Sequence, residues 1–254
     1  MNKSAAILVI GDEVLSGRTQ DTNSHTIARF LGSLGIDLGE IRVVSDREPA
    51  IVAALNALRA QYDLVFTTGG IGPTHDDITA DAVAAAFGVG IDYHPEAYAL
   101  LEARYPPGEF NEARKRMART PHGATLIANP VSVAPGFSIG NVHVMAGVPQ
   151  VMRAMLESLA PSLPRGQATT AITIQTNLLE GVIAAGLGVI QKAEKDVSLG
   201  SYPFLRDGVP GVQLVVRSRD ADAAERAAVA VEAMLQGLGG AAQRIIAADS
   251  PPPK

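Results

Sequence analysis

Short apolar runs alternate with helix-like patterns from the start of the chain to Gly90. The apolar runs are typical of strands buried on both faces of a parallel sheet, and they occupy residues 5–10, 41–44 and 64–66. Apolar positions recur at helical spacing between and after these runs, at residues 22–34, 48–58 and 78–87. The alternation predicts an α/β fold with three layers, α/β/α, in which helices cover both faces of a mostly parallel sheet.

The pattern changes after Gly90. Two helices are predicted at residues 95–104 and 109–119, the second ending before Pro121. Short strands are predicted at residues 125–127, 136–139 and 142–145, followed by a helix that Gly147-Val148-Pro149 opens.

The remaining residues predict a second, smaller unit. Strand, helix, two strands and an alanine-rich helix capped by Asp220 follow one another, an order that favours a small α+β domain with its helices on one face. We therefore expect an α/β domain at 4–163, a small α+β domain at 168–238 and a tail at 239–254, whose end, Ser250-Pro251-Pro252-Pro253-Lys254, suits a solvated segment.

The amino-acid composition of the chain excludes several kinds of site and partner. The chain has no cysteine, which excludes disulfides and thiolate chemistry, and a net charge of −5, which argues against nucleic acid and acidic lipid as partners. No apolar run is long enough to span a membrane, and the first residues do not resemble a signal peptide. We expect a cytoplasmic protein.

The segment from Thr67 to Thr79 carries the densest chemical signal. A buried strand runs into Gly69, Gly70 and Gly72, whose backbone N–H groups a phosphate can approach closely. Asp76 and Asp77 follow, and carboxylates beside a phosphate favour a divalent metal or acid–base chemistry. The alternative is that one of the two aspartates only caps the helix at 78–87, which leaves the other unexplained.

Two further clusters stand near this motif in the predicted topology. Asp12 and Glu13 end the first strand, and with Asp21 they are expected to share a pocket with the paired aspartates. The alternative is that Asp12 and Glu13 merely solvate a turn. Four cations lie among the residues 114–119, where Glu112 and Arg116 are spaced for an i,i+4 pair. Such a run is either a solvated helix face or a source of one or two phosphate-binding side chains.

Several motifs in the same order resemble those of the competence/damage-inducible protein A (CinA-like) family. They are Gly11 to Gly17, Asp21 to Ser24, Thr67 to Thr79, Pro135-Gly136-Phe137 and Gly147-Val148-Pro149. Residues 4 to 163 resemble that family's N-terminal, molybdopterin-binding domain of the molybdenum-cofactor-biosynthesis fold. Longer members carry a C-terminal deamidase domain, and this chain ends too early for us to expect that activity.

The resemblance implies two ligand classes. Some relatives bind molybdopterin through the Gly-Gly-x-Gly-Pro-Thr loop and an aspartate, here Asp77, whereas others hydrolyse nucleotide pyrophosphates such as ADP-ribose or FAD with a divalent metal. The paired aspartates favour a metal-dependent nucleotide pyrophosphatase, a hydrolase; the alternative is a molybdopterin-binding or cofactor-biosynthesis protein, catalytic or regulatory. We expect magnesium, manganese or cobalt as cofactor, a small nucleotide or pterin as partner, and a homo-oligomer.

These hypotheses assign roles to named residues. We expect catalytic roles for Asp76, Asp77, Lys115 and Arg116, with Asp76, Asp77 and Glu13 as metal ligands. The ligand and its phosphate are expected to contact Gly69, Gly70, Gly72, Thr74, Asp21 and Asn23.

Overall fold

A computed structural model describes residues 2–206 and 208–245. The chain divides into two compact units, Met1–Gly166 and Gln167–Lys254. No helix in the described part of the chain is both long and apolar enough to cross a membrane.

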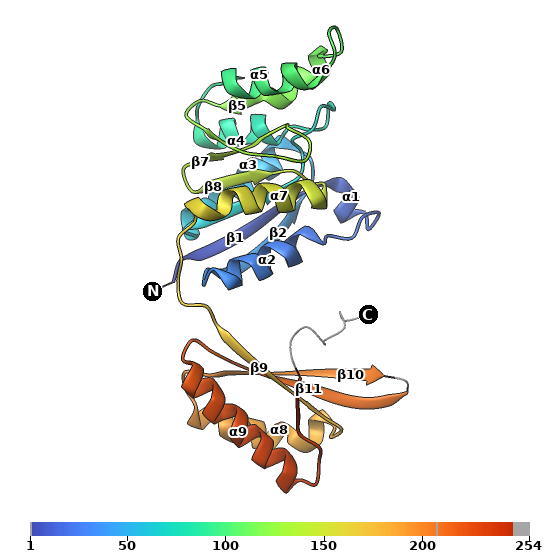
Figure 1. The fold of residues 1–254 in the computed structure, drawn as a ribbon, viewed down its shortest axis with the longest axis vertical. Helices are drawn as coiled ribbons and strands as arrows, with labels where there is room; N and C mark the ends of the chain where they lie inside the picture. Colours follow the sequence, from blue (N-terminus) through green and yellow to red (C-terminus); the bar gives the residue numbers. More distant parts are fainter. Residues whose placement is uncertain (1, 207, 246–254) are drawn as a thin grey trace. The chain divides into compact units, whose positions relative to one another are not determined.

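The first unit is built on a six-stranded sheet. Its strands, in spatial order, are β2 (Asp37–Val44), β1 (Ser4–Ile10), β3 (Leu64–Thr68), β8 (Val142–Met145), β7 (Gly136–Ile139) and β6 (Thr125–Ile127). The first four pair in parallel, and β7 runs antiparallel to both of its neighbours. The sheet is therefore mostly parallel, which confirms the predicted α/β class (Figure 1).

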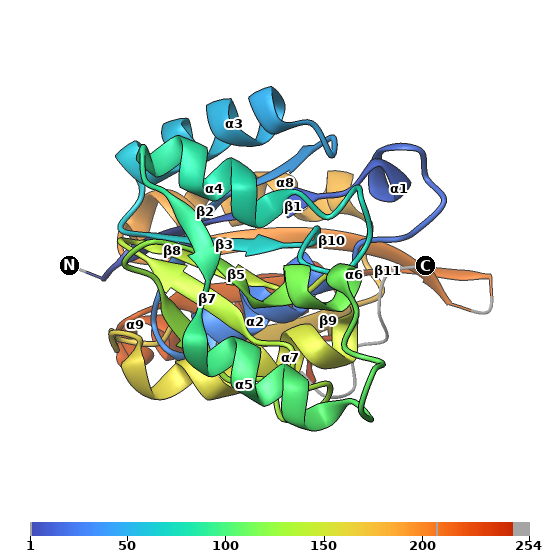
Figure 2. The same ribbon diagram turned by 90° about the horizontal axis from the view of Figure 1, so that it is seen from above.

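Helices cover both faces of this sheet (Figure 2). On one face lie α2 (Asn23–Ser33) and α7 (Pro149–Leu159), and on the other lie α3 (Glu48–Gln61) and α4 (Thr79–Phe87). Alternate side chains of β1 supply both cores: Ile7 packs on the side of α2 and α7, and Leu8 on the side of α3 and α4. Both are fully buried, as expected for the continuous apolar run of a central strand.

The segment predicted as a helix at 109–119 is divided into three pieces. They are α6 (Glu112–Lys115), a 3-10 turn (Arg116–Ala118) and β5 (Arg119–Pro121). β5 pairs antiparallel with β4 (Ile91–Tyr93), beside α5 (Pro95–Arg104). The single long helix was wrong because strand pairing and the approach to Pro121 favour extended backbone from Arg119 onward.

A short helix also follows the first strand, at residues for which the sequence predicted no helix. α1 (Asp12–Leu15) directly follows β1, and the N–H of Val14 donates to the carbonyl oxygen of Gly11 at 3.2 Å. This turn holds Glu13 close to the carboxyl end of β1.

The second unit is a four-stranded antiparallel sheet with two helices. Its elements in chain order are β9 (Thr170–Thr176), α8 (Glu180–Ala193), β10 (Ser198–Arg206), β11 (Val209–Ser218), α9 (Ala221–Gly237) and β12 (Gln243–Ile245). One core joins the sheet to both helices, and Asp220 caps α9 by accepting from the N–H groups of Asp222 and Ala223.

One strand of this sheet lies in the segment predicted as a tail. β12 pairs with β9, and Arg244 forms ion pairs of 2.7 Å with Glu225 and 2.6 Å with Glu232, both on α9. A turn at Gly239, where φ is 76°, returns the chain to the sheet. Three residues give too short a period-2 pattern to predict a strand; the predicted Pro-rich end, 250–254, lies outside the described residues.

We expect the first unit to fold without the second. It has its own two-sided core, and its last residue, Gly166, donates its N–H to the carbonyl oxygen of Leu34 at 2.8 Å. A protein truncated after Gly166 should therefore give a cooperative thermal transition and a dispersed amide NMR spectrum. A molten or insoluble product would show that the two units share one cooperative core.

Asp63 should make the stability of the first unit depend on acidity. Its carboxylate accepts from Lys3 Nζ at 2.7 Å and from the N–H and hydroxyl of Ser4, which lowers its pKa from 3.8 to about 2. Because the folded pKa is depressed, this contribution is present above pH 3.8 and is lost as pH falls through about 2.

Asp63→Asn should thus be less stable than the wild type at neutral pH, with the difference shrinking below pH 3.8. Urea denaturation at a series of pH values measures it. A difference that stays constant down to pH 2 would contradict the assignment.

Candidate functional site

A glycine turn follows β3 at the carboxyl edge of the parallel strands. Gly69 and Gly70 have φ values of 110° and 67°, in the region that favours glycine. A Cβ atom at Gly69 would collide with the carbonyl oxygen of Ile10, and one at Gly70 with the hydroxyl of Thr79. Thr79 fixes the turn on α4, since its hydroxyl donates to the carbonyl oxygen of Gly69 at 2.9 Å and its N–H to that of Gly70 at 3.0 Å.

The next backbone amides are free to bind an anion. In residues 2–206 and 208–245, the N–H groups of Gly70, Ile71 and Gly72 donate no hydrogen bond. All three residues line the cavity described below. Consecutive free N–H groups in a turn of this kind form a concave anion-binding surface.

Asp77 turns back toward this segment and does not cap α4. Its carboxylate accepts from the N–H of Thr74 at 2.9 Å and from the Thr74 hydroxyl, and the N–H of Asp77 donates to the carbonyl oxygen of Thr74. The N-cap position of α4 is Ile78, which makes no side-chain cap. The capping alternative is therefore wrong for both aspartates, because this local turn closes before the helix begins.

Asp76 is the more exposed member of the pair, with 65% of its side chain accessible. The neighbouring Thr74 side chain and the N–H of Asp76 itself lower the pKa of Asp76, and the nearby His75 ring adds to the decrease. Asp76 is thus a carboxylate at neutral pH. His75 itself is 98% accessible and lies 3.9 Å from Asp76.

A cavity of about 480 Å³ joins the glycine turn to four carboxylates, which are Glu13, Asp46, Asp76 and Asp77. Sequence analysis predicted three of them and missed Asp46. Asp46 follows β2, the neighbour of β1, so the rule that ligands bind beyond the carboxyl ends of parallel strands was the signal that could have identified it.

Negative charge accumulates around Asp46. Burial raises the pKa of the Asp46 carboxyl, and the charges of Glu13, Asp12 and Asp76 raise it further. A hydrogen bond of 2.7 Å from the N–H of Asp12 opposes the increase. An anionic ligand therefore enters this cavity favourably only if positive charge accompanies it.

The remainder of the cavity is mostly apolar. Its wall is formed by Ile71, Met117, Ala134, Ala146, Val148, Val151 and Met155, with Asn129 and Ser132 as polar members. An apolar wall beside an anion-binding turn suits a ligand with a charged end and a ring system.

The two predicted cations have different environments. Lys115 lines neither cavity and forms a 2.6 Å ion pair with Glu112, which raises the pKa of Lys115. Glu112 therefore pairs with Lys115, and its predicted i,i+4 pair with Arg116 was wrong, because α6 ends at Lys115 and the chain tightens into a 3-10 turn.

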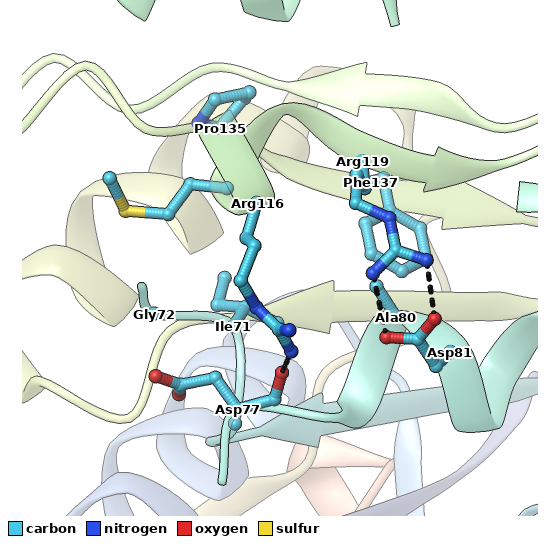
Figure 3. A pocket seen from close by; sticks show the side chains of 11 residues that line it. Ile71, Gly72, Asp77, Ala80, Asp81, Arg116, Arg119, Pro135 and Phe137 are labelled. Carbon is cyan, nitrogen blue, oxygen red and sulfur yellow. Dashed lines mark hydrogen bonds and ion pairs between the residues drawn. The ribbon is translucent and has the colours of Figure 1, made fainter. Parts of the chain in front are cut away.

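Arg116 reaches the back of the glycine turn, in a small cavity of about 20 Å³ (Figure 3). Its guanidinium donates to the backbone oxygen of Asp77 at 3.3 Å, and its buried Nε has no partner in the described structure. Beside it, Arg119 is held by Asp81 through two hydrogen bonds of 2.6 and 3.2 Å. In the part of the chain that the structure describes, Arg116 is thus the cation of this cavity that no carboxylate pairs, whereas Arg119 is paired with Asp81.

Asp21 and Asn23 support the site from outside the cavity. The Asp21 carboxylate accepts from the N–H groups of Asn23 and Ser24 at the start of α2. The Asn23 amide donates to the Thr68 hydroxyl at 2.8 Å and to the carbonyl oxygen of Gly147 at 2.7 Å. Neither Asp21 nor Asn23 lines the cavity. Gly147, whose carbonyl oxygen Asn23 holds, does line it.

The donor set suits a hard divalent cation, although it is not a closed metal site. No group of three or more His, Asp or Glu side chains in the described residues is close enough to hold an ion. Magnesium typically takes one or two protein carboxylates and completes its coordination with substrate phosphate and water. Asp76, Asp77 and Glu13, with Asp46, supply oxygen ligands of the kind that such an ion takes.

Each of the two units matches a known protein family. Residues 6–165 match the family model described as "Probable molybdopterin binding domain", and residues 169–239 match "FAD synthase, middle domain". The chain is 36% identical over 226 residues to a CinA-like protein of Citrifermentans bemidjiense, covering 86% of this chain and 54% of that protein. It is 29% identical over 262 residues to a probable FAD synthase of Caenorhabditis briggsae, covering 92% of this chain and 50% of that protein.

A solved structure agrees with these matches. The CinA protein of Thermoplasma acidophilum, described as of unknown function, is 33% identical and superposes with a TM-score of 0.61. The match covers 63% of this chain and 98% of that one. The chain spans about half the length of the CinA-like protein and of the FAD synthase.

Proposed function

This chain belongs to the molybdopterin-binding-domain family as a CinA-like member, and on that basis we propose that its first unit is a divalent-metal-dependent nucleotide pyrophosphatase. The observation that carries the proposal is the single cavity in which an anion-binding glycine turn meets four carboxylates. A phosphate ligand alone would be repelled by those carboxylates, and a divalent cation would remove the repulsion.

The chemistry assigned to this site is hydrolysis of a phosphoanhydride. Water attacks one phosphorus atom, the bridging P–O bond breaks, and two monophosphates leave; ADP-ribose gives AMP and ribose phosphate, and FAD gives AMP and FMN. The metal ion, when bound, supplies positive charge to the phosphoryl oxygens and lowers the pKa of bound water.

The chain's own residues have distinct roles in this scheme. The N–H groups of Gly70, Ile71 and Gly72 hold one phosphate, and Asp76 and Asp77, which line the same cavity, would hold the cation. Arg116, which lines the small cavity beside the glycine turn, neutralises charge that develops on the phosphoryl oxygens, whereas Lys115 lines neither cavity and is paired with Glu112.

The names of the relatives support a nucleotide as the substrate, but they do not specify which nucleotide this chain would use. A probable FAD synthase is similar along nearly the whole chain, and the second unit matches the middle domain of such enzymes. The family model favours a second candidate, binding of molybdopterin, because the same turn and the apolar wall suit a phosphorylated pterin.

One experiment separates the two candidates. The purified protein is incubated with ADP-ribose or FAD in magnesium, manganese or cobalt, and in a chelator control. We expect AMP release with at least one metal and none in the chelator. Absence of AMP from every combination, together with retention of a pterin, would contradict hydrolysis and favour the molybdopterin-binding function.

A further inference from the structure

The connection between β6 and β7 holds an unusual backbone conformation beside the cavity. Val133 has a φ of 73°, and among the described residues no other non-glycine residue has a positive φ. This region is strongly disfavoured for a β-branched side chain, and strain of this kind gathers at ligand sites. Two of its neighbours, Ser132 and Ala134, line the large cavity.

Asn129 holds this conformation in place. Its buried amide donates to the Ser132 hydroxyl oxygen at 2.6 Å and to the carbonyl oxygen of Ala134 at 2.8 Å. Its side-chain oxygen accepts from the N–H groups of Val131 and Ser132, and its backbone oxygen accepts from that of Val133. Five hydrogen bonds thus converge on one residue and fix the whole loop.

This arrangement leaves one donor at the cavity wall. Because the Ser132 oxygen accepts from Asn129, the Ser132 hydroxyl hydrogen remains to be donated, and Ser132 is exposed. Around it the wall is apolar, with Met117 and Met155 among its members. A hydroxyl donor on an apolar wall is suited to the edge of a ring whose faces lie against aliphatic and thioether groups.

We propose that the loop 129–134 is the recognition wall for the organic half of the ligand, a nucleoside joined to its diphosphate, with Ser132 as the specificity-determining donor. Asn129 and Val133 are positioning residues that keep Ser132 directed at the cavity. The class of ligand in this inference rests on the proposed function. The inference adds how the protein distinguishes a nucleoside diphosphate from a bare diphosphate.

The test compares two probes by titration calorimetry in magnesium, ADP-ribose and inorganic pyrophosphate, each with a methylene bridge between its phosphorus atoms so that neither is hydrolysed. Ser132→Ala removes the donor, so its affinity for ADP-ribose should fall about threefold to tenfold, with pyrophosphate affinity unchanged. Val131→Ala is the matched control, because Val131 is exposed on the same loop and does not line the cavity.

Val133→Gly distinguishes positioning from simple structural support. Relief of the strained φ should raise or preserve the melting temperature, whereas the freed loop should weaken ADP-ribose binding and raise KM with little change in kcat. A residue with only a structural role would not give a more stable protein with poorer nucleotide affinity.

Unchanged ADP-ribose affinity in both Ser132→Ala and Val133→Gly would overturn the inference, as would a wild-type protein that binds ADP-ribose no more tightly than pyrophosphate. Neither result would contradict hydrolysis. If the wild-type protein binds ADP-ribose through this loop without releasing AMP, the recognition wall stands and the pyrophosphatase proposal fails.

Discussion

Replacing Asp77 by asparagine should leave the fold intact and lower pyrophosphatase turnover by about a hundredfold or more. An asparagine side-chain oxygen can still accept from the N–H of Thr74, so the local turn should persist. The substitution removes a negative charge that would hold the cation. Asp76→Asn should have the same direction of effect, because its carboxylate lines the same cavity.

The measurement pairs thermal melting with AMP release in magnesium, manganese and cobalt. Glu157→Gln serves as the matched control, because Glu157 carries the same charge, is exposed on α7 and lies outside the cavity. If Asp77→Asn and Asp76→Asn both hydrolyse at the wild-type rate, the carboxylates are structural and the enzyme proposal fails.

Gly69→Ala should destabilise the first unit by about 3 kcal/mol or more. The new methyl group would meet the carbonyl oxygen of Ile10, a backbone atom of the central strand that cannot rotate away, at a φ of 110°. Denaturation in urea measures the loss.

Gly72→Ala is the matched comparison within the same turn. Its Cβ would lie 2.6 Å from a carboxylate oxygen of Asp77, which is the end of a mobile side chain. We expect a stability change below about 1 kcal/mol, with weaker phosphate binding because Asp77 must move. Equal stability losses in the two variants would show that the turn has no special contact with β1.

Gly70 is a poorer position than Gly72 for a test of ligand binding. A valine there would block ligand approach, but it would also strain a φ of 67° and displace the Thr79 hydroxyl that fixes the turn. Loss of binding in Gly70→Val would therefore mix two causes, and Gly72 is the better position at which to test the phosphate contact.

The layout of the first unit followed from its sequence because β1 and β3 are continuous apolar runs with helical patterns between them. Those two features depend on local periodicity, which a sequence displays directly. β12 and the division of residues 109–119 depended instead on long-range partners, such as the ion pairs of Arg244 on α9 and the pairing of β5 with β4.

The candidate site was accessible from sequence only in part. The glycine turn with Asp76 and Asp77 is contiguous, and Glu13 ends a recognisable strand. Asp46 and Asn129 reach the same region from other segments, and neither has a local pattern that marks it. The choice of Arg116 over Lys115 depended on where a single turn of helix ends, which sequence spacing does not determine.

The central claim is that the glycine turn and the carboxylates form one site in which phosphate and a divalent cation bind together. Calorimetric titration of wild-type protein with a methylene-bridged, non-hydrolysable analogue of ADP-ribose, in magnesium and then in excess chelator, tests it most directly. We expect the binding seen in magnesium to be lost in the chelator, because four carboxylates then face the diphosphate without a positive charge to balance them. Equal affinity in both conditions would contradict it.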